Sequence, residues 1–146
     1  MEIERKFLVK SIPSLEGVSC KEIIQGYLCT KPVVRVRKEG DEYILTYKGK
    51  GHMAREEYNL PLTEESYAHL VEKCDGHLIR KTRYYIPLED GLVAELDIFK
   101  APHDGLVVVE VEFETTRQAE AFVPPSWFGR DVTYDKRYKN ARLSRA

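Results

Sequence analysis

Residues 1–9 read MEIERKFLV, and charged and apolar side chains alternate in this stretch. Alternate residues of an extended strand point to opposite faces, so Glu2, Glu4 and Lys6 share one face while Ile3 lies on the other. At ~3.4 Å per residue, two carboxylates and an amine fall within about 14 Å on that face. A single face of this kind is typical of a strand exposed to solvent. It becomes informative because similar faces recur along the chain.

Later stretches repeat the alternation, and there the paired charges have the same sign. The pairs are Arg35 with Arg37, Lys81 with Arg83, Glu95 with Asp97, and Glu110 with Glu112. Faces exposed to solvent usually intersperse Lys and Glu with Ser, Thr and Gln. The separation of cations and carboxylates onto different strands is what the binding of a polyanion together with its metal would require.

Eight stretches have the alternation and composition of β-strands and are bounded by short turns. They are residues 1–9, 21–28, 33–38, 42–48, 55–60, 79–87, 92–100 and 106–114, with a further short strand at 131–133. Two helices are expected, one N-capped by Thr63 and ended by Gly76, the other opened by a capping box of Thr115 and Gln118. The pattern predicts a mainly β (α+β) domain built on an antiparallel meander.

Such a sheet has two possible arrangements. The aliphatic faces could form the core of a sandwich, which would leave the charged faces in solvent. Alternatively, the sheet could close into a barrel, which removes its edges, with charged faces inside and helices and loops over the aliphatic faces. Composition does not decide between them, but the separation of charges by sign favours the charged interior.

The composition excludes several classes of protein. The 146 residues suit one domain, and 23 basic against 24 acidic residues, a net charge of −1, argue against nonspecific nucleic-acid binding. The three cysteines form no Cys-x-x-Cys pair, so neither a disulfide framework nor a zinc site is expected, and a cytoplasmic location fits. No apolar run approaches ~18 residues and no signal peptide precedes the first strand, so no membrane partner is expected.

The residue types on the charged faces point to phosphate chemistry. Arginine holds phosphate oxygens with a planar fork, and lysine adds a compact charge. Carboxylates are the ligands that hard cations such as Mg²⁺ and Mn²⁺ prefer. The chain lacks a GxxxxGK[ST] loop, so side chains would have to hold the phosphates. Several cations converging in a tunnel could bind a linear triphosphate.

Taken in order, the motifs resemble those of the CYTH superfamily, also called triphosphate tunnel metalloenzymes. Glu2-x-Glu4-x-Lys6 is similar to the ExExK signature of that family. The similarity continues through Gln25-Gly26-Tyr27-Leu28, Val34-Arg35-Val36-Arg37, Lys48-Gly49-Lys50-Gly51, Arg55-x-Glu57, Lys81-x-Arg83-Tyr84, Glu95-x-Asp97, Glu110-x-Glu112 and Asp131-Val132-Thr133. The resemblance implies one domain over residues 1–146, an eight-stranded antiparallel closed β-barrel or tunnel with a charged interior and a few short helices outside. It also implies dependence on Mg²⁺ or Mn²⁺.

Carried over position by position, the resemblance gives roles to most of the charged residues. The implied metal ligands are Glu2, Glu4, Asp97, Glu110 and Glu112. The implied substrate contacts are Lys6, Arg35, Arg37, Lys48, Glu57, Lys81 and Arg83, joined by Lys136 or Arg137 from the C-terminal segment. Lys48, Glu4 and Glu112 are the implied catalytic residues. Asn59 lies where relatives often carry a glutamate and is left out of the site, and Arg5 is expected at the surface.

The resemblance leaves the reaction open among several activities. A hydrolase of inorganic tripolyphosphate or a similar triphosphate fits best, because the short chain shows no appended domain and no evident nucleoside pocket. The alternatives are a class IV-type adenylate cyclase, a thiamine triphosphatase, and a non-catalytic protein that binds polyphosphate or nucleotides. The five acidic candidates count against a pure binding protein. A homodimer is the assembly that the resemblance implies.

Overall fold

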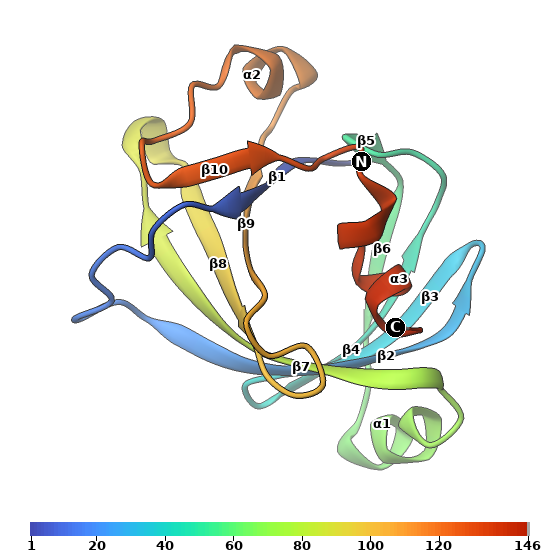
Figure 1. Cartoon of the computed structure of the whole chain (residues 1–146). Helices are drawn as coiled ribbons and strands as arrows, with labels where there is room; N and C mark the ends of the chain where they lie inside the picture. The colour runs from blue at the N-terminus through green and yellow to red at the C-terminus, as the bar shows by residue number, and fades with distance from the viewer. Residues whose placement is uncertain (146) are drawn as a thin grey trace.

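Ten β-strands form one sheet in which every pairing within residues 1–145 is antiparallel. The computed structural model describes these residues, and Figure 1 shows their path. The strands are β1 (Glu2–Val9), β2 (Cys20–Thr30), β3 (Val33–Glu39), β4 (Glu42–Lys48), β5 (Ala54–Arg55), β6 (Glu57–Pro61), β7 (Asp75–Pro87), β8 (Val93–Phe99), β9 (Val107–Glu112) and β10 (Phe128–Asp131). Their order is β10-β1-β9-β8-β7-β2-β3-β4-β6, with β5 paired to β1.

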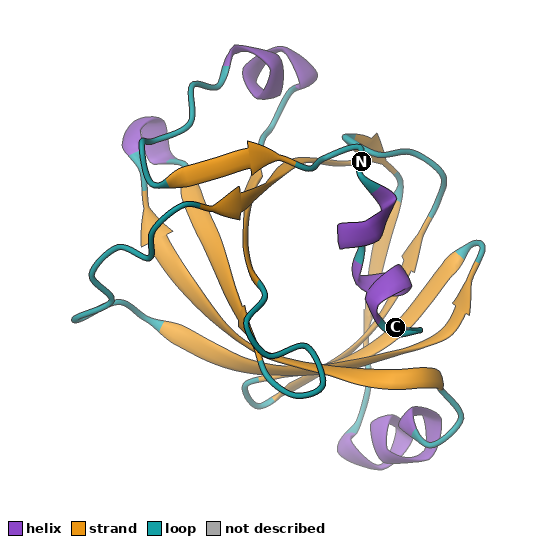
Figure 2. Ribbon diagram, in the orientation of Figure 1, coloured by secondary structure: helices purple, strands orange, loops and turns teal. Residues whose placement is uncertain are grey.

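The sheet closes on itself through its shortest strand. Only Glu56 separates β5 from β6; β6 pairs with β4, while β5 pairs with β1 through Glu2–Arg55 and Ile3–Ala54. If β5 and β6 are counted as one interrupted strand, the circuit has eight strand positions, and β10 lies against the other end of β1. The expected antiparallel barrel is therefore confirmed. Figure 2 shows the strands as a ring with helical segments outside it.

Several strand boundaries differ from those expected, and two of the differences fall in the stretches 55–60 and 131–133. The stretch 55–60 is interrupted at Glu56, and the short strand expected at 131–133 instead ends at Asp131. The Asp131 Oδ1 atom accepts hydrogen bonds from the backbone N–H and the hydroxyl of Thr133, at 2.8 and 2.6 Å. Such a side-chain turn competes with strand pairing and ends β10.

The helices are short and begin as the capping signals predict. In α1 (Glu64–Val71) the Thr63 side chain accepts from the N–H of Ser66, and in α2 (Thr116–Ala121) Thr115 accepts from that of Gln118. Helix α1 ends well before Gly76, the expected stop. The remaining helices are η1 (Glu89–Gly91), η2 (Lys136–Tyr138) and α3 (Asn140–Leu143). None of the helices in residues 1–145 has the length and hydropathy needed to span a membrane.

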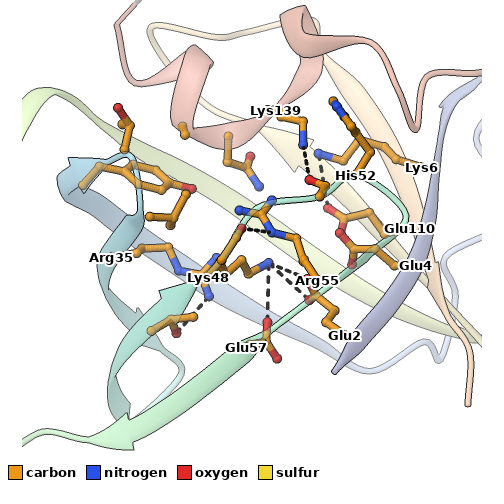
Figure 3. Close-up of a pocket in the computed structure, with 18 of the residues that line it drawn as sticks. Glu2, Glu4, Lys6, Arg35, Lys48, His52, Arg55, Glu57, Glu110 and Lys139 are labelled. Atoms are coloured by element: carbon orange, nitrogen blue, oxygen red, sulfur yellow. Dashed lines mark hydrogen bonds and ion pairs between the residues drawn. The ribbon is translucent and has the colours of Figure 1, made fainter.

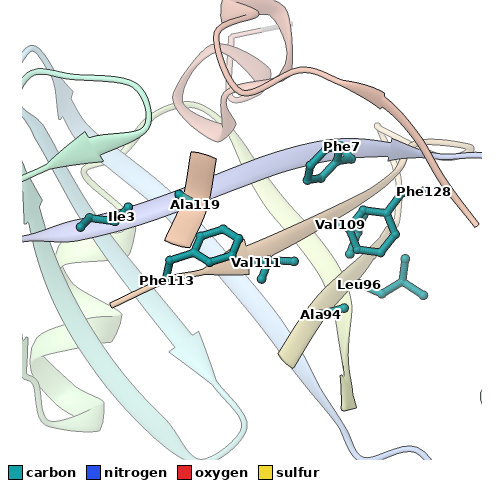
Figure 4. Packing of buried hydrophobic residues seen from close by; sticks show 9 residues of the cluster. All are labelled: Ile3, Phe7, Ala94, Leu96, Val109, Val111, Phe113, Ala119 and Phe128. Carbon is teal, nitrogen blue, oxygen red and sulfur yellow. The ribbon is translucent and has the colours of Figure 1, made fainter. Parts of the chain in front are cut away.

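The aliphatic faces of β1, β8 and β9 point out of the barrel and form a core beneath α2. Figure 4 shows this cluster, which consists of Ile3, Phe7, Ala94, Leu96, Val109, Val111, Phe113, Ala119 and Phe128. Arg5 shares the outward face of β1 but is not a free surface residue. Its guanidinium donates to the carbonyl oxygens of Ala119 and Phe122, pairs with Asp131 at 2.9 Å and lies over the Phe7 ring. It therefore fastens α2 and β10 to β1.

A second apolar cluster follows the inward faces of the strands. Ile79 and Val108 share their strand faces with Arg83 and Glu110, because their positions differ by an even number of residues. They pack with Leu143 of α3, and the other buried members are Tyr27, Val33 and Phe99. The inside of the barrel is therefore charged along part of its length and apolar where α3 packs.

Candidate functional site

The inward faces of the barrel enclose a cavity of about 1270 Å³. Figure 3 shows acidic and basic side chains pointing into it from several strands, from the loop after β4 and from the C-terminal segment. The residues expected in the site that line this cavity are Glu2, Glu4, Lys6, Arg35, Arg37, Lys48, Glu57, Arg83, Glu110, Glu112 and Lys136. The two-residue period of each strand accounts for their convergence.

Three expected site residues do not line the cavity. Lys81 and Asp97 are fully buried, at 0% exposure, and pair with each other inside the barrel, next to Phe99 of the second apolar cluster. The Arg137 side chain is 69% exposed and pairs with Asp135 at 2.7 Å. Consecutive residues of the tight turn η2 point in different directions, so Lys136 and not Arg137 reaches the cavity.

Strands β1 and β9 carry four glutamates that we call the carboxylate wall: Glu2, Glu4, Glu110 and Glu112. The strand register places Glu4 opposite Glu112 and Lys6 opposite Glu110. Burial and the negative charge of Glu110 raise the pKa of Glu4 well above its usual value. Despite its burial, Glu110 has a pKa well below its usual value because of Lys6 and Arg83. Within this pair, the surroundings favour the protonated form of Glu4 and the ionised form of Glu110.

Glu110 leaves an acceptor atom unused in this wall. Its Oε1 is buried and accepts no hydrogen bond from the described residues 1–145; Lys6 Nζ lies 3.7 Å away and Arg83 Nη2 3.9 Å away. An unsatisfied buried oxygen is costly and is the kind of donor that a hard divalent cation binds. Across residues 1–145, however, no three His, Cys or acidic side chains gather as a ready-made metal site. The donors for Mg²⁺ or Mn²⁺ are present without being assembled around one point.

Lys48 connects the carboxylate wall to β6. Its Nζ donates to both oxygens of Glu2, at 3.0 and 3.2 Å, and lies 3.4 Å from Glu57. Burial raises the pKa of Glu2 to about 7, although Lys48 acts against the rise. The contact with Glu57 is the one expected of a wall residue that orients a cation.

Strands β3 and β7, which flank β2, carry three buried arginines that we call the arginine wall: Arg35, Arg37 and Arg83. Arg83 donates from Nε and Nη2 to the two oxygens of Asp97, at 2.7 and 2.9 Å. Lys81 Nζ lies 2.7 Å from the same carboxylate. Burial lowers the pKa of Lys81 to about 7, although Asp97 acts against the fall.

The other two arginines are held by the neutral side chains of Gln25 and Thr46, and Arg37 also by Glu39. Arg37 donates from Nε to Gln25 Oε1 at 2.7 Å and from Nη1 to Glu39 at 3.1 Å. Burial and the neighbouring Arg35 lower the pKa of Arg37 to about 10. Arg35 donates from Nη2 to Thr46 Oγ1 at 3.2 Å, while its buried Nε has no partner in residues 1–145. That Nε is available to a bound anion.

Several residues that line the cavity were not predicted from the sequence. Asn59, which was left out of the site, lines the cavity, accepts from Thr46 at 2.7 Å and donates to Glu57 at 3.1 Å. It shares a strand face with Glu57, and that signal could have identified it. His52 and Lys139 also line the cavity, but they come from a loop and from the C-terminal segment. No strand period marks such positions.

Comparison with known proteins agrees with this geometry. The model of the CYTH domain matches residues 1–131. An inorganic triphosphatase of Nitrosomonas europaea is 42% identical over 146 residues, covering 98% of this chain and 96% of the relative. An inorganic triphosphatase of Acetivibrio thermocellus is 33% identical over 153 residues, covering 97% of this chain and 92% of the relative.

Solved structures share the architecture. A crystal structure of an inorganic triphosphatase has a TM-score of 0.74 and 40% identity, and the match covers 100% of this chain and 95% of that one. A structure from Bacillus halodurans, described as that of an adenylate cyclase candidate, has a TM-score of 0.66 and 18% identity, covers 82% of this chain and 84% of that one, and shows the fold alone. The chain belongs to the CYTH domain family.

Proposed function

We infer that the chain is a metal-dependent hydrolase of triphosphates, and we propose inorganic tripolyphosphate as its substrate. The two relatives named inorganic triphosphatases align with nearly its whole length. The observation that carries the proposal is the cavity, in which buried cations and the carboxylate wall face the same space. A linear triphosphate and its metal need both sets of groups at once.

The cations would bind the substrate. Lys6 and the arginine wall line the cavity, and guanidinium groups pair with phosphate oxygens through two parallel hydrogen bonds. The unused Nε of Arg35 supports this role, because a buried donor without a partner costs about 1–3 kcal/mol. A phosphate oxygen would remove that cost.

The carboxylate wall would hold the cation, with Glu4, Glu110 and Glu112 as the central ligands and Glu2 beside them. The unused oxygen of Glu110 supports this proposal, and so does the raised pKa of Glu4, since a bound divalent cation would favour the ionised carboxylate. Mg²⁺ or Mn²⁺, when bound, would neutralise phosphate charge and make a nearby water more acidic.

We propose Lys48, Glu4 and Glu112 as the catalytic residues. Lys48 is fixed between Glu2 and Glu57, so its ammonium group can stabilise charge that develops on the leaving phosphate. Glu112 is the most exposed member of the carboxylate wall, so water reaches it, and its carboxylate can accept a proton from the attacking water.

We further propose that residues 1–146 form a single domain that assembles as a homodimer in a reducing cytoplasm and binds neither nucleic acid nor membranes. One continuous sheet supports the single domain, and three free cysteines support the reducing compartment. The net charge of −1 supports the absence of nucleic acid.

Phosphate release tests the proposed function. Purified protein is assayed with tripolyphosphate, ATP and thiamine triphosphate, each with Mg²⁺, with Mn²⁺ or with EDTA, and cyclic AMP is measured in parallel. We expect fastest release from tripolyphosphate and none in EDTA. Cyclic AMP production, a preference for thiamine triphosphate, or binding without turnover would replace the proposal by one of the other three activities.

A further inference from the structure

Two arginines of the arginine wall are each held by a buried side chain that does not line the cavity. Arg83 Nε donates to Asp97 Oδ1, and Arg37 Nε donates to Gln25 Oε1, both at 2.7 Å. Asp97 and Gln25 are 0% exposed, whereas both arginines line the cavity. The same guanidinium atom is therefore fixed by a buried acceptor in each case.

The two arginines also make matching contacts on the side that faces the cavity. Arg83 Nη1 donates to Glu95 at 3.3 Å, and Arg37 Nη1 donates to Glu39 at 3.1 Å. Both glutamates line the cavity. A guanidinium group is planar with five N–H donors in a fixed fork, so fixing Nε sets the plane and directs Nη1 of each arginine toward the cavity. Each arginine is thereby oriented before any phosphate arrives.

Asp97 has no oxygen free for a metal. Arg83 occupies both of its oxygens, and Lys81 Nζ lies 2.7 Å from Oδ2. The Lys81 ammonium is itself buried over the Phe99 ring, 5.3 Å from its centre. A cation could bind Asp97 only by displacing these buried contacts with Arg83 and Lys81.

We propose that Asp97 and Gln25 are positioning residues that orient Arg83 and Arg37 for the terminal oxygens of a triphosphate, and that Asp97 is not a metal ligand. This corrects the ligand role that the sequence resemblance implies for Asp97. The proposal rests on the proposed function, because orientation of these arginines matters only if they contact phosphate.

The two anchors differ in charge, and their removal should differ in size. Asp97→Asn keeps one acceptor oxygen but places an amide N–H₂ against the Arg83 donors. We expect it to weaken tripolyphosphate binding between about 10- and 100-fold, the range for hydrogen bonds to charged groups. Gln25→Met removes one neutral acceptor at nearly constant volume and should weaken binding about 3- to 10-fold.

Calorimetry of tripolyphosphate binding in EDTA separates positioning from metal binding. Without metal, only the cations hold the anion, so both variants should bind more weakly than the parent, while Glu112→Gln should not. In hydrolysis assays, Asp97→Asn should raise KM for tripolyphosphate without raising the half-saturating Mg²⁺ concentration. Glu22→Gln, which alters an exposed acid paired with Lys100, is the control expected to behave like the parent.

The proposal is overturned if Asp97→Asn binds metal-free tripolyphosphate like the parent, or if its defect is repaired by excess Mg²⁺. Should Asp97→Asn fail to fold, the test rests on metal-free tripolyphosphate binding by Gln25→Met. Binding like that of the parent overturns the proposal. Failure of the proposed function looks different. In that case the parent itself would bind tripolyphosphate without releasing phosphate under any metal condition.

Discussion

The two charged walls of the cavity balance their charges in different ways. In the arginine wall each guanidinium has a fixed partner, and Arg83 with Asp97 forms a complete two-point contact. In the carboxylate wall, Glu110 keeps an unused oxygen, and burial with the charge of Glu110 raises the pKa of Glu4. Within residues 1–145, each wall therefore keeps one buried unpaired atom, the Nε of Arg35 in the first and the Oε1 of Glu110 in the second. A phosphate oxygen suits the first atom and a cation suits the second. Binding of the anion and binding of the metal are therefore expected to be separable.

Removal of the metal should produce the largest effect. In EDTA the carboxylate wall lacks its cation, so phosphate release from tripolyphosphate should fall to background, while the arginine wall still binds the anion. Phosphate release and calorimetry, measured on the same preparation before and after Mg²⁺ is restored, check both parts. Undiminished turnover in EDTA would mean that the carboxylates serve another purpose.

Replacement of one arginine should weaken the anion site directly. Arg37→Ala removes a buried guanidinium, and we expect metal-free tripolyphosphate binding to lose about 1.5–3 kcal/mol, the scale of hydrogen bonds to a charged group. The rate should fall as well if the contact tightens in the transition state. Titration calorimetry measures the loss, and parent-like affinity would remove Arg37 from the site.

Glu112→Gln should affect the other wall alone. The amide keeps the shape but removes an anionic ligand, so turnover should fall and more Mg²⁺ should be needed to reach half-maximal rate. Metal-free binding of tripolyphosphate should be unchanged or slightly tighter, because one negative charge has gone. Normal hydrolysis of tripolyphosphate by Glu112→Gln at limiting Mg²⁺ would contradict the separate roles of the two walls.

In the absence of metal, the carboxylate wall should make the stability of the fold depend on pH. The pKa of Glu2 rises from 4.5 to about 7 on folding, so between these values the folded chain binds more protons than the unfolded chain. Its stability therefore falls as the pH rises through this window, by at most about 3 kcal/mol for this group. Denaturant titrations at pH 5 and pH 8 in EDTA should show a smaller fall in Glu2→Gln, and an equal fall would contradict the assignment.

Much of the cavity was predictable because strands obey a two-residue period. That rule placed Glu4 and Lys6 on one face, and Arg35 and Arg37 on another, without any structure. The separation of charges by sign favoured a charged interior, and the resemblance implied the barrel.

The two-residue period could not tell that Asp97 is covered by Arg83 and Lys81 and does not line the cavity, since the period gives the face of a residue and not its neighbours. Lys139 was missed because the C-terminal segment has no strand period. It lies in the cavity through packing of η2 and α3, beyond the residues that the CYTH model matches.

The most direct test of the account is a crystal structure with Mn²⁺ and a non-hydrolysable tripolyphosphate analogue, recorded at a wavelength where Mn²⁺ scatters anomalously. The account predicts an anomalous peak beside Glu4, Glu110 and Glu112, with phosphate oxygens on Arg37 and Arg83 and with Asp97 still bound to Arg83. A peak on Asp97, or an analogue bound outside the cavity, would contradict it.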